Sequence, residues 1–211
     1  MINTGDGPLK CQIDLKEWTQ DSEGKDVYTE AKDIVFFPKI MTVEANEQRA
    51  IRVGVKGPPS QKEKTYRIFI EEIPSQKKTQ DLKTPGKIAA GLTIAFRYAV
   101  PIFVMPVKRQ ESSVVEKIEL SGGTARTTVR NTGNVHVKLS TVTFRGKSAA
   151  GKELFVIEVG GWYVLNGMSR NYEATVPKEH CGELAVIEVV AQSESSTSTG
   201  TVNVDAAMCA Q

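Results

Sequence analysis

The run from Leu92 to Pro106 constrains the fold of this chain more than any other segment. Its sequence, LTIAFRYAVPIFVMP, is apolar and rich in β-branched and aromatic residues, which favours an extended strand. Side chains alternate between the two faces of a strand, so one face carries the large apolar residues Leu92, Ile94, Phe96 and Tyr98. A long apolar strand at a sheet edge promotes aggregation. A protein that keeps one therefore either covers it or uses it to bind another strand.

The rest of the chain shows the same preference for strands. Short alternating runs such as Leu9–Trp18 and Thr65–Ile73 recur, and each is bounded by Gly, Pro, Asn or Ser. Helical periodicity is almost absent. The pattern predicts an all-β protein of the sandwich type.

A polar stretch after Pro106 divides the chain into two predicted domains. About seven strands follow it, among them Ala125–Asn131 and Leu154–Leu165, which is typical of one immunoglobulin-like β-sandwich. The segment before it contains fewer strands and ends with the Leu92–Pro106 run. We therefore expect an N-terminal domain over residues 1–108 and a C-terminal immunoglobulin-like domain over 114–211.

Composition argues against several classes of protein. The chain has 27 Lys and Arg against 25 Asp and Glu, a net charge of +2, which disfavours nucleic-acid binding driven by bulk charge. No apolar run approaches the roughly 18 residues of a membrane helix, and the first residues are polar and unlike a signal peptide. There is no CxxC pair, no metal-ligand spacing of the two histidines, and no phosphate-binding glycine loop. We predict a protein without a cofactor that is not an enzyme.

Four segments together resemble the PapD-like periplasmic chaperones of the chaperone–usher pathway for pili. They are Phe36–Pro38 with Gln48–Val53, Glu63–Pro74, Leu92–Pro106, and the second-domain turns Val129–Asn134 and Gly161–Gly167. Glu63–Pro74, EKTYRIFIEEIP, is similar to the most recognisable strand of that family. The resemblance spans nearly the whole chain in order and spacing.

The resemblance implies two immunoglobulin-like domains in a boomerang arrangement, and a chaperone that completes unfinished pilus subunits. Such a chaperone adds its own strand to the subunit and delivers it to an outer-membrane usher without ATP. Main-chain hydrogen bonds then supply affinity, and alternating side chains fill pockets. Carried onto this chain, the donor side chains are Leu92, Ile94, Phe96 and Tyr98, and the compartment is the periplasm.

Two departures from the family pattern affect these expectations. The family's anchoring Lys falls at Pro101, so Arg97 is the nearest candidate anchor, in a different register. The N-terminal strands of the first domain also have no counterpart in this chain. We therefore expect an incomplete first domain that self-associates or accepts a strand from a neighbouring chain.

Pairing of Glu183–Gln192 with Gly200–Asp205 as a hairpin brings Cys181 near Cys209, which predicts a disulfide that the periplasm permits.

The alternative to a chaperone is a tandem immunoglobulin-like surface adhesion or scaffold module. The two differ in whether the strand from Leu92 to Tyr98 is available to a partner or covered.

Overall fold

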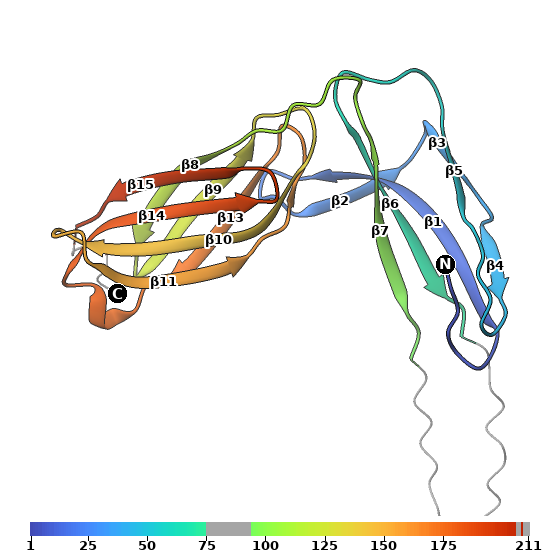
Figure 1. The fold of residues 1–211 in the computed structure, drawn as a ribbon, viewed down its shortest axis with the longest axis horizontal. Helices are drawn as coiled ribbons and strands as arrows, with labels where there is room; N and C mark the ends of the chain where they lie inside the picture. The colour runs from blue at the N-terminus through green and yellow to red at the C-terminus, as the bar shows by residue number, and fades with distance from the viewer. Residues whose placement is uncertain (75–93, 206–207, 209–211) are drawn as a thin grey trace, which may run out of the picture. The chain divides into compact units, whose positions relative to one another are not determined.

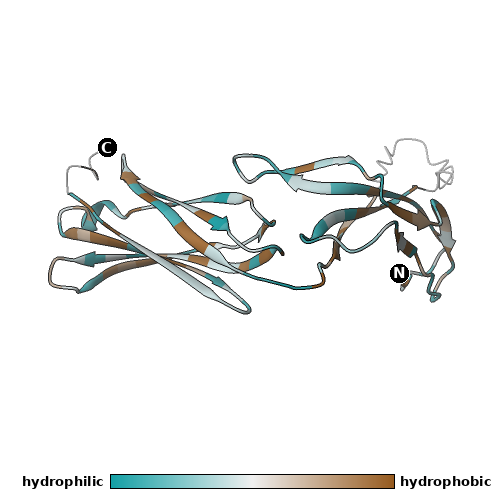
Figure 2. Cartoon of the chain, turned by 90° about the horizontal axis from the view of Figure 1, so that it is seen from above, coloured by the Kyte–Doolittle hydropathy of each residue, from teal (hydrophilic) through white to brown (hydrophobic). Residues whose placement is uncertain are grey.

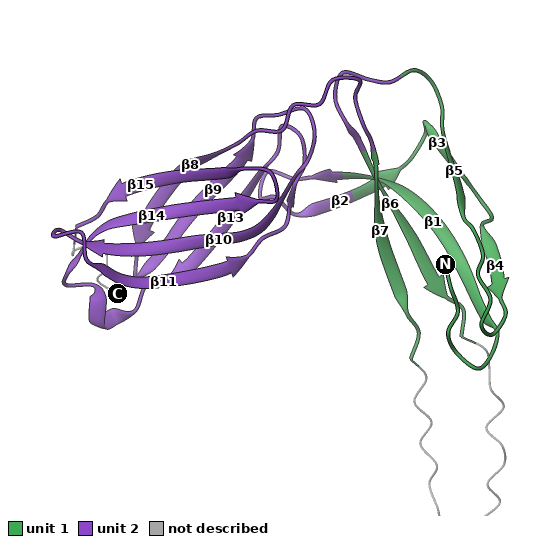
Figure 3. Ribbon diagram, in the orientation of Figure 1, with its two compact units in different colours: residues 1–18, 28–58, 65–103 green, residues 19–27, 59–64, 104–211 purple. Residues whose placement is uncertain are grey.

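The computed structural model describes residues 1–74, 94–205 and 208, and most of these residues form strands, which turns and loops connect (Figure 1). The described chain divides into two compact units (Figure 3). Unit 1 comprises residues 1–18, 28–58 and 65–103, and unit 2 comprises residues 19–27, 59–64 and 104–211.

The first half of the chain forms two sheets. One follows the order β2-β1-β6-β7, with β4 also paired to β1, and the other joins β3 to β5. The bounds are β1 (Leu9–Gln20), β2 (Asp26–Glu30), β3 (Ile34–Phe37), β4 (Ile40–Val43), β5 (Arg52–Val55), β6 (Lys64–Glu72) and β7 (Arg97–Val104).

The core of unit 1 follows from the alternation that the sequence shows in β1. Cys11, Ile13 and Leu15 are buried, and Ile13 and Leu15 lie opposite Ile70 and Ile68 of β6. Directly opposed residues of antiparallel strands share a face, so these side chains form one apolar surface. The amino terminus pairs with the segment that precedes β5, through a bridge between Ile2 and Gln48.

Unit 2 contains a sandwich of two sheets. One has the order β11-β10-β14-β15, with β12 paired to β10, and the other has the order β13-β9-β8. The bounds are β8 (Ser113–Ser121), β9 (Thr124–Asn131), β10 (Val137–Ser148), β11 (Glu153–Gly160), β12 (Tyr163–Val164), β13 (Ser169–Thr175), β14 (Leu184–Ser193) and β15 (Thr197–Asn203), with a short 3₁₀ turn at Lys178–His180.

Both sheets of unit 2 contribute to one core. Val129 of β9, Phe144 of β10 and Ile187 of β14 are completely buried members of the same apolar cluster. The apolar stretches of Figure 2 accordingly fall on the strands, interleaved with hydrophilic positions. This alternation is what a sandwich with two solvated outer faces requires.

The all-β prediction is confirmed, and the sheets are consistent with two β-sandwich domains. Individual strands differ from expectation. The strand expected from Leu92 begins at Arg97, and of residues 94–96 before it Phe96 accepts a main-chain hydrogen bond from Glu72 of β6. The expected strand Leu154–Leu165 is interrupted at Gly160–Gly161 and becomes β11 and β12, while β2 was not predicted. The boomerang arrangement and the domain limits 1–108 and 114–211 stay predictions.

Candidate functional site

The candidate site is the edge strand β7 together with the three residues before it. In the described part of the chain β7 ends the sheet order, next to β6. The N–H of Glu72 donates to the carbonyl of Phe96 at 2.9 Å, which fixes the register at the start of this pair. The predicted donor residue Leu92 lies outside the described residues.

The other three predicted donor side chains are exposed. Ile94 is 63% exposed, Phe96 56% and Tyr98 57%, and the rings of Phe96 and Tyr98 stack with centroids 6.3 Å apart. The same face continues through Val100 to Ile102 as the strand proceeds. Large apolar side chains at successive alternate positions give this edge the chemistry of a strand that binds another strand.

An apolar groove in unit 1 adjoins this face of β7. Its volume is about 510 Å³, and its walls are the aliphatic and aromatic side chains of Met1, Ile51, Val53, Ile68, Ile70, Tyr98, Val100 and Ile102. The groove therefore runs between the β3–β5 sheet and the edge of the larger sheet. Ile68 and Ile70 connect it to the core of unit 1.

Arg97 lies on the opposite face of β7 from these apolar side chains. Its Nε is 2.6 Å from the carboxylate of Glu71, and its guanidinium lies 4.4 Å from the ring centroid of Phe69. Both partners are on β6, the neighbouring strand. The predicted anchor is thus already engaged within its own sheet, and it remains 61% exposed at its side chain.

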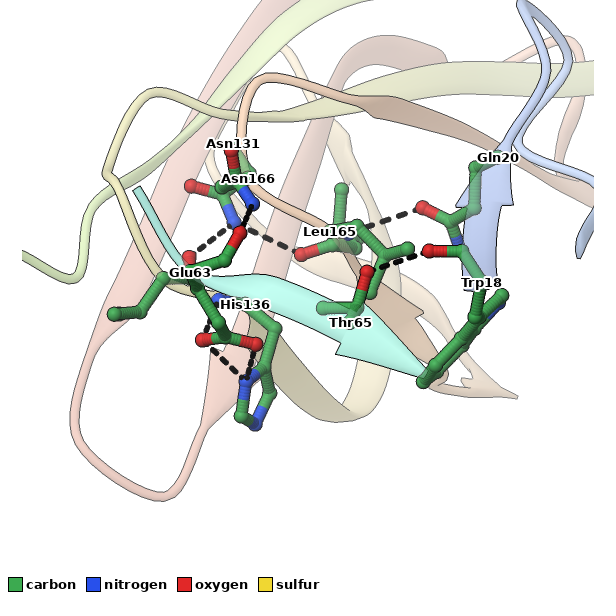
Figure 4. Close-up of polar contacts among 10 residues, drawn as sticks. Trp18, Gln20, Glu63, Thr65, Asn131, His136, Leu165 and Asn166 are labelled. Carbon is green, nitrogen blue, oxygen red and sulfur yellow. Dashed lines mark hydrogen bonds and ion pairs between the residues drawn. The ribbon is translucent and has the colours of Figure 1, made fainter. Parts of the chain in front are cut away.

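A polar cluster within unit 2 was not predicted from the sequence (Figure 4). The Glu63 side chain is completely buried, and its carboxylate oxygens lie 2.8 and 3.0 Å from Nδ1 of His136. The main-chain N–H of His136 also donates to it at 3.0 Å. The ring and the main chain of His136 therefore both contact the same buried carboxylate. The sequence placed Glu63 in a motif, but it contained no signal for the pairing with His136.

Asn131 organises the turn that carries this histidine. Its side chain is completely buried, and its Nδ2 donates to the carbonyls of Val135 at 2.7 Å and Val164 at 2.8 Å. Its Oδ1 accepts from the N–H of Gly133 at 2.8 Å. Both N–H donors of the side-chain amide and one lone pair of Oδ1 are therefore used.

One of the two predicted disulfide partners is described. Cys181, at the end of the 3₁₀ turn, is disulfide-bonded, and Cys209 lies outside the described residues. The pairing Cys181–Cys209 stays a prediction. Cys11 is a free, buried thiol whose pKa is raised by burial and, to a smaller extent, by the charge of Glu72.

No helix among the described residues has the length and apolarity to cross a membrane. Among them, no group of three or more His, Cys, Asp or Glu side chains has the arrangement of a metal site.

Comparison with known proteins points to one family. Residues 1–110 match the family model described as pili and flagellar-assembly chaperone, PapD N-terminal domain. No curated protein matches the chain.

Solved structures of pilus chaperones share the fold at low sequence identity. The CsuC–CsuE chaperone–tip adhesion subunit complex of Acinetobacter baumannii matches with a TM-score of 0.61 and 18% identity, covering 95% of this chain and 87% of that chain. The CupB2 chaperone of Pseudomonas aeruginosa matches at 0.53 and 16% (97% and 90% covered). The SafA pilin–SafB chaperone complex of Salmonella enterica matches at 0.54 and 16% (95% and 86% covered).

Proposed function

This chain belongs to the family of pili and flagellar-assembly chaperones with a PapD N-terminal domain, and on that premise we propose that it binds pilus subunits by donor-strand complementation. The strand it supplies to the subunit is β7 with the residues before it. Leu92, Ile94, Phe96 and Tyr98 are the proposed donor side chains. Two of the matched solved structures are complexes of a chaperone with a tip adhesion subunit or with a pilin, which supports this class of partner.

The observation that carries the proposal is the exposure of Ile94, Phe96 and Tyr98 beside a strand edge. Isolated exposed apolar residues are ordinary, but three large ones in alternate positions at one edge are not. Burying each of them in a subunit contributes about 1.5–3 kcal/mol. Together with main-chain hydrogen bonds, three such side chains hold a subunit without any input from ATP.

Several finer features belong to the same proposal. The chain acts in the periplasm, where a disulfide at Cys181 persists, and it delivers its subunits to an outer-membrane usher. It is not an enzyme and needs no cofactor. Because Arg97 is engaged by Glu71 and Phe69, subunit capture relies on strand pairing more than on a charged anchor.

The alternative is a tandem immunoglobulin-like adhesion or scaffold module. Such a module covers its apolar edges, because an open edge invites aggregation. The exposed side chains beside β7 favour the chaperone over this alternative.

The test is co-expression with candidate pilus subunits, followed by co-purification through a tag on the chaperone. Ile94→Asp and Phe96→Asp each place a charge in the proposed contact, so we expect at least about tenfold less captured subunit. Val107→Asp is the matched control, because Val107 is 86% exposed and lies beyond β7. Undiminished capture by Ile94→Asp and Phe96→Asp contradicts the donor-strand assignment, and failure of the parent chain to capture any subunit contradicts the function.

A further inference from the structure

The hydrogen-bonding groups of β7 alternate in direction along the strand. In an antiparallel pair, a residue that bonds its partner directs both N–H and C=O toward it, and the next residue directs both away. β6 and β7 run in opposite directions (Figure 1), and Glu72 donates to Phe96. Phe96, Tyr98, Val100 and Ile102 therefore direct their main-chain groups toward β6.

The intervening residues direct their main-chain groups to the opposite edge of β7, the free edge, at which no strand of the described residues pairs. Arg97 presents one N–H donor and one C=O acceptor there. Ala99 presents its N–H, and its carbonyl accepts from Nη1 of Arg67 at 3.5 Å. The next residue in this series is Pro101, which presents a carbonyl but has no N–H. The proline ring stands where a strand added at this edge would need an N–H donor. Within sheets, proline occurs mainly on edge strands, at positions whose N–H would face solvent.

We propose that Pro101 ends the backbone pairing of a captured strand, so that a pilus subunit pairs with residues 94–99 and not with the later half of β7. This inference rests on the proposed function and adds the register of the contact. The carbonyl of the subunit strand opposite Pro101 finds no donor, and leaving such a group unpaired in a dry interface is unfavourable.

Side-chain exposure along the strand supports the same division. Ile94, Phe96 and Tyr98 are each more than half exposed, Val100 is 45% exposed, and Ile102 is partly buried and packs on the core of unit 1. The residues before Pro101 are thus available to a partner. Ile102, which follows Pro101, instead packs against the core of unit 1.

The experiment is amide hydrogen exchange, resolved by NMR, on the complex with whichever pilus subunit co-purifies. We expect the amides of Arg97 and Ala99 to gain at least about tenfold protection on binding, and the amide of Phe103 to gain none. Pro101→Ala restores the missing donor. In that variant we expect added protection at positions 101 and 103, and about three- to tenfold slower dissociation of the subunit.

Ala99→Pro is the matched variant in the other direction. It removes a donor at the free edge and no bond to β6, so the melting temperature stays close to that of the parent while subunit dissociation accelerates by a similar factor. Protection of the Phe103 amide in the parent complex, or unchanged dissociation in both variants, overturns this inference alone. A chain that captures no subunit overturns the proposed function and the inference together.

Discussion

The carboxylate of Glu63 is buried against the imidazole of His136, with Nδ1 2.8 Å from the nearer oxygen, and the main chain of His136 donates to the same carboxylate. Both residues belong to unit 2, although they are far apart in sequence. The carbonyl of Glu63 also accepts from Nδ2 of Asn166 at 3.0 Å. The segment that opens β6 is thereby fixed to two separate parts of the unit.

We expect His136→Ala to destabilise the protein by about 3 kcal/mol, because it leaves the buried Glu63 carboxylate without its ring partner. Glu63→Gln keeps the shape of the side chain and removes its charge, so we expect a smaller loss of stability than for His136→Ala. Urea denaturation followed by fluorescence measures both. Lys16→Ala, which breaks an exposed pair with Asp14, is the control and changes stability by less than about 1 kcal/mol. A loss for His136→Ala no larger than that of the control contradicts the prediction.

Gly161 and Gly160 offer a matched pair at the end of β11. A Cβ on Gly161 meets the carbonyl oxygen of Leu139 at 2.2 Å, whereas a Cβ on Gly160 meets nothing within 4 Å. We expect Gly161→Ala to lower the free energy of unfolding by about 2 kcal/mol or more, and Gly160→Ala to change it by about 0.5 kcal/mol at most. Thermal melts of the two variants compare them directly, and equal melting temperatures speak against the close approach.

Tyr66 is expected to make the folded state less stable as the pH becomes alkaline. Its hydroxyl donates to Asp33 at 2.6 Å, and its pKa is raised above the ordinary value of 10.0, first by burial and then by this hydrogen bond. The folded state thus keeps the proton that the unfolded chain loses. The stabilisation is complete below about pH 10 and is lost as the pH rises above it, by up to about 1.4 kcal/mol per pH unit.

Tyr66→Phe removes this titration. Because the variant lacks the hydrogen bond to Asp33, we expect its free energy of unfolding at pH 7 to be about 1 kcal/mol lower. We also expect its stability to decline less steeply above pH 10. Denaturant titrations at several pH values measure the slope. Tyr172, whose pKa burial also raises, remains in the variant and leaves part of the slope in place. An unchanged slope in Tyr66→Phe shows that another group is responsible.

The disulfide prediction concerns the pairing of Cys181 with Cys209. With this link and Cys11 free, one thiol per chain reacts in denaturant without reductant. We expect Cys209→Ser to cost about 3 kcal/mol, since the bond closes a loop of intermediate length. Adding Cys181→Ser to that variant costs little more, because the bond is already absent. Peptide mapping without reduction identifies the pair, and three reactive thiols per chain exclude it.

Self-association is expected through the groove of unit 1 and the strand edges beside it. Val53 lines the groove but does not belong to β7. Val53→Glu therefore separates the two kinds of contact: we expect it to shift the chain toward monomer in light scattering across a dilution series, while subunit capture persists. A parent chain that stays monomeric at all concentrations tested removes the basis of this expectation.

The sequence predicted the strands best where side chains alternate over many residues. β1 and β9 differ from expectation by at most about two residues at their ends, because their buried faces repeat with period two. β6 lies close to its expected bounds although residues 65–69 are buried on both faces of the strand. β2 was missed, since its residues Asp26–Glu30 are mostly polar and exposed and give no such signal. β12, only two residues long, was merged with β11 because the bend at Gly160–Gly161 depends on a close approach to Leu139.

The candidate site was predictable in part. The alternating residues Ile94, Phe96 and Tyr98 were visible in the sequence, and their exposure is a property of the folded unit that hydrophobicity alone does not reveal. The engagement of Arg97 by Glu71 depends on the register between β6 and β7. The pairing of Glu63 with His136 was out of reach, because it joins positions 73 residues apart through tertiary structure.

The contacts of Gln20 affect how the sandwich of unit 2 can be isolated as a fragment. Its amide donates to the carbonyl of Tyr163 at 2.9 Å and accepts from the N–H of Leu165 at 3.0 Å, so a residue from the end of β1 completes the hydrogen bonding of unit 2. A fragment cut at residue 114 leaves these buried groups unsatisfied. Cutting the chain once does not separate the units cleanly, because short pieces of the first hundred residues are built into the second.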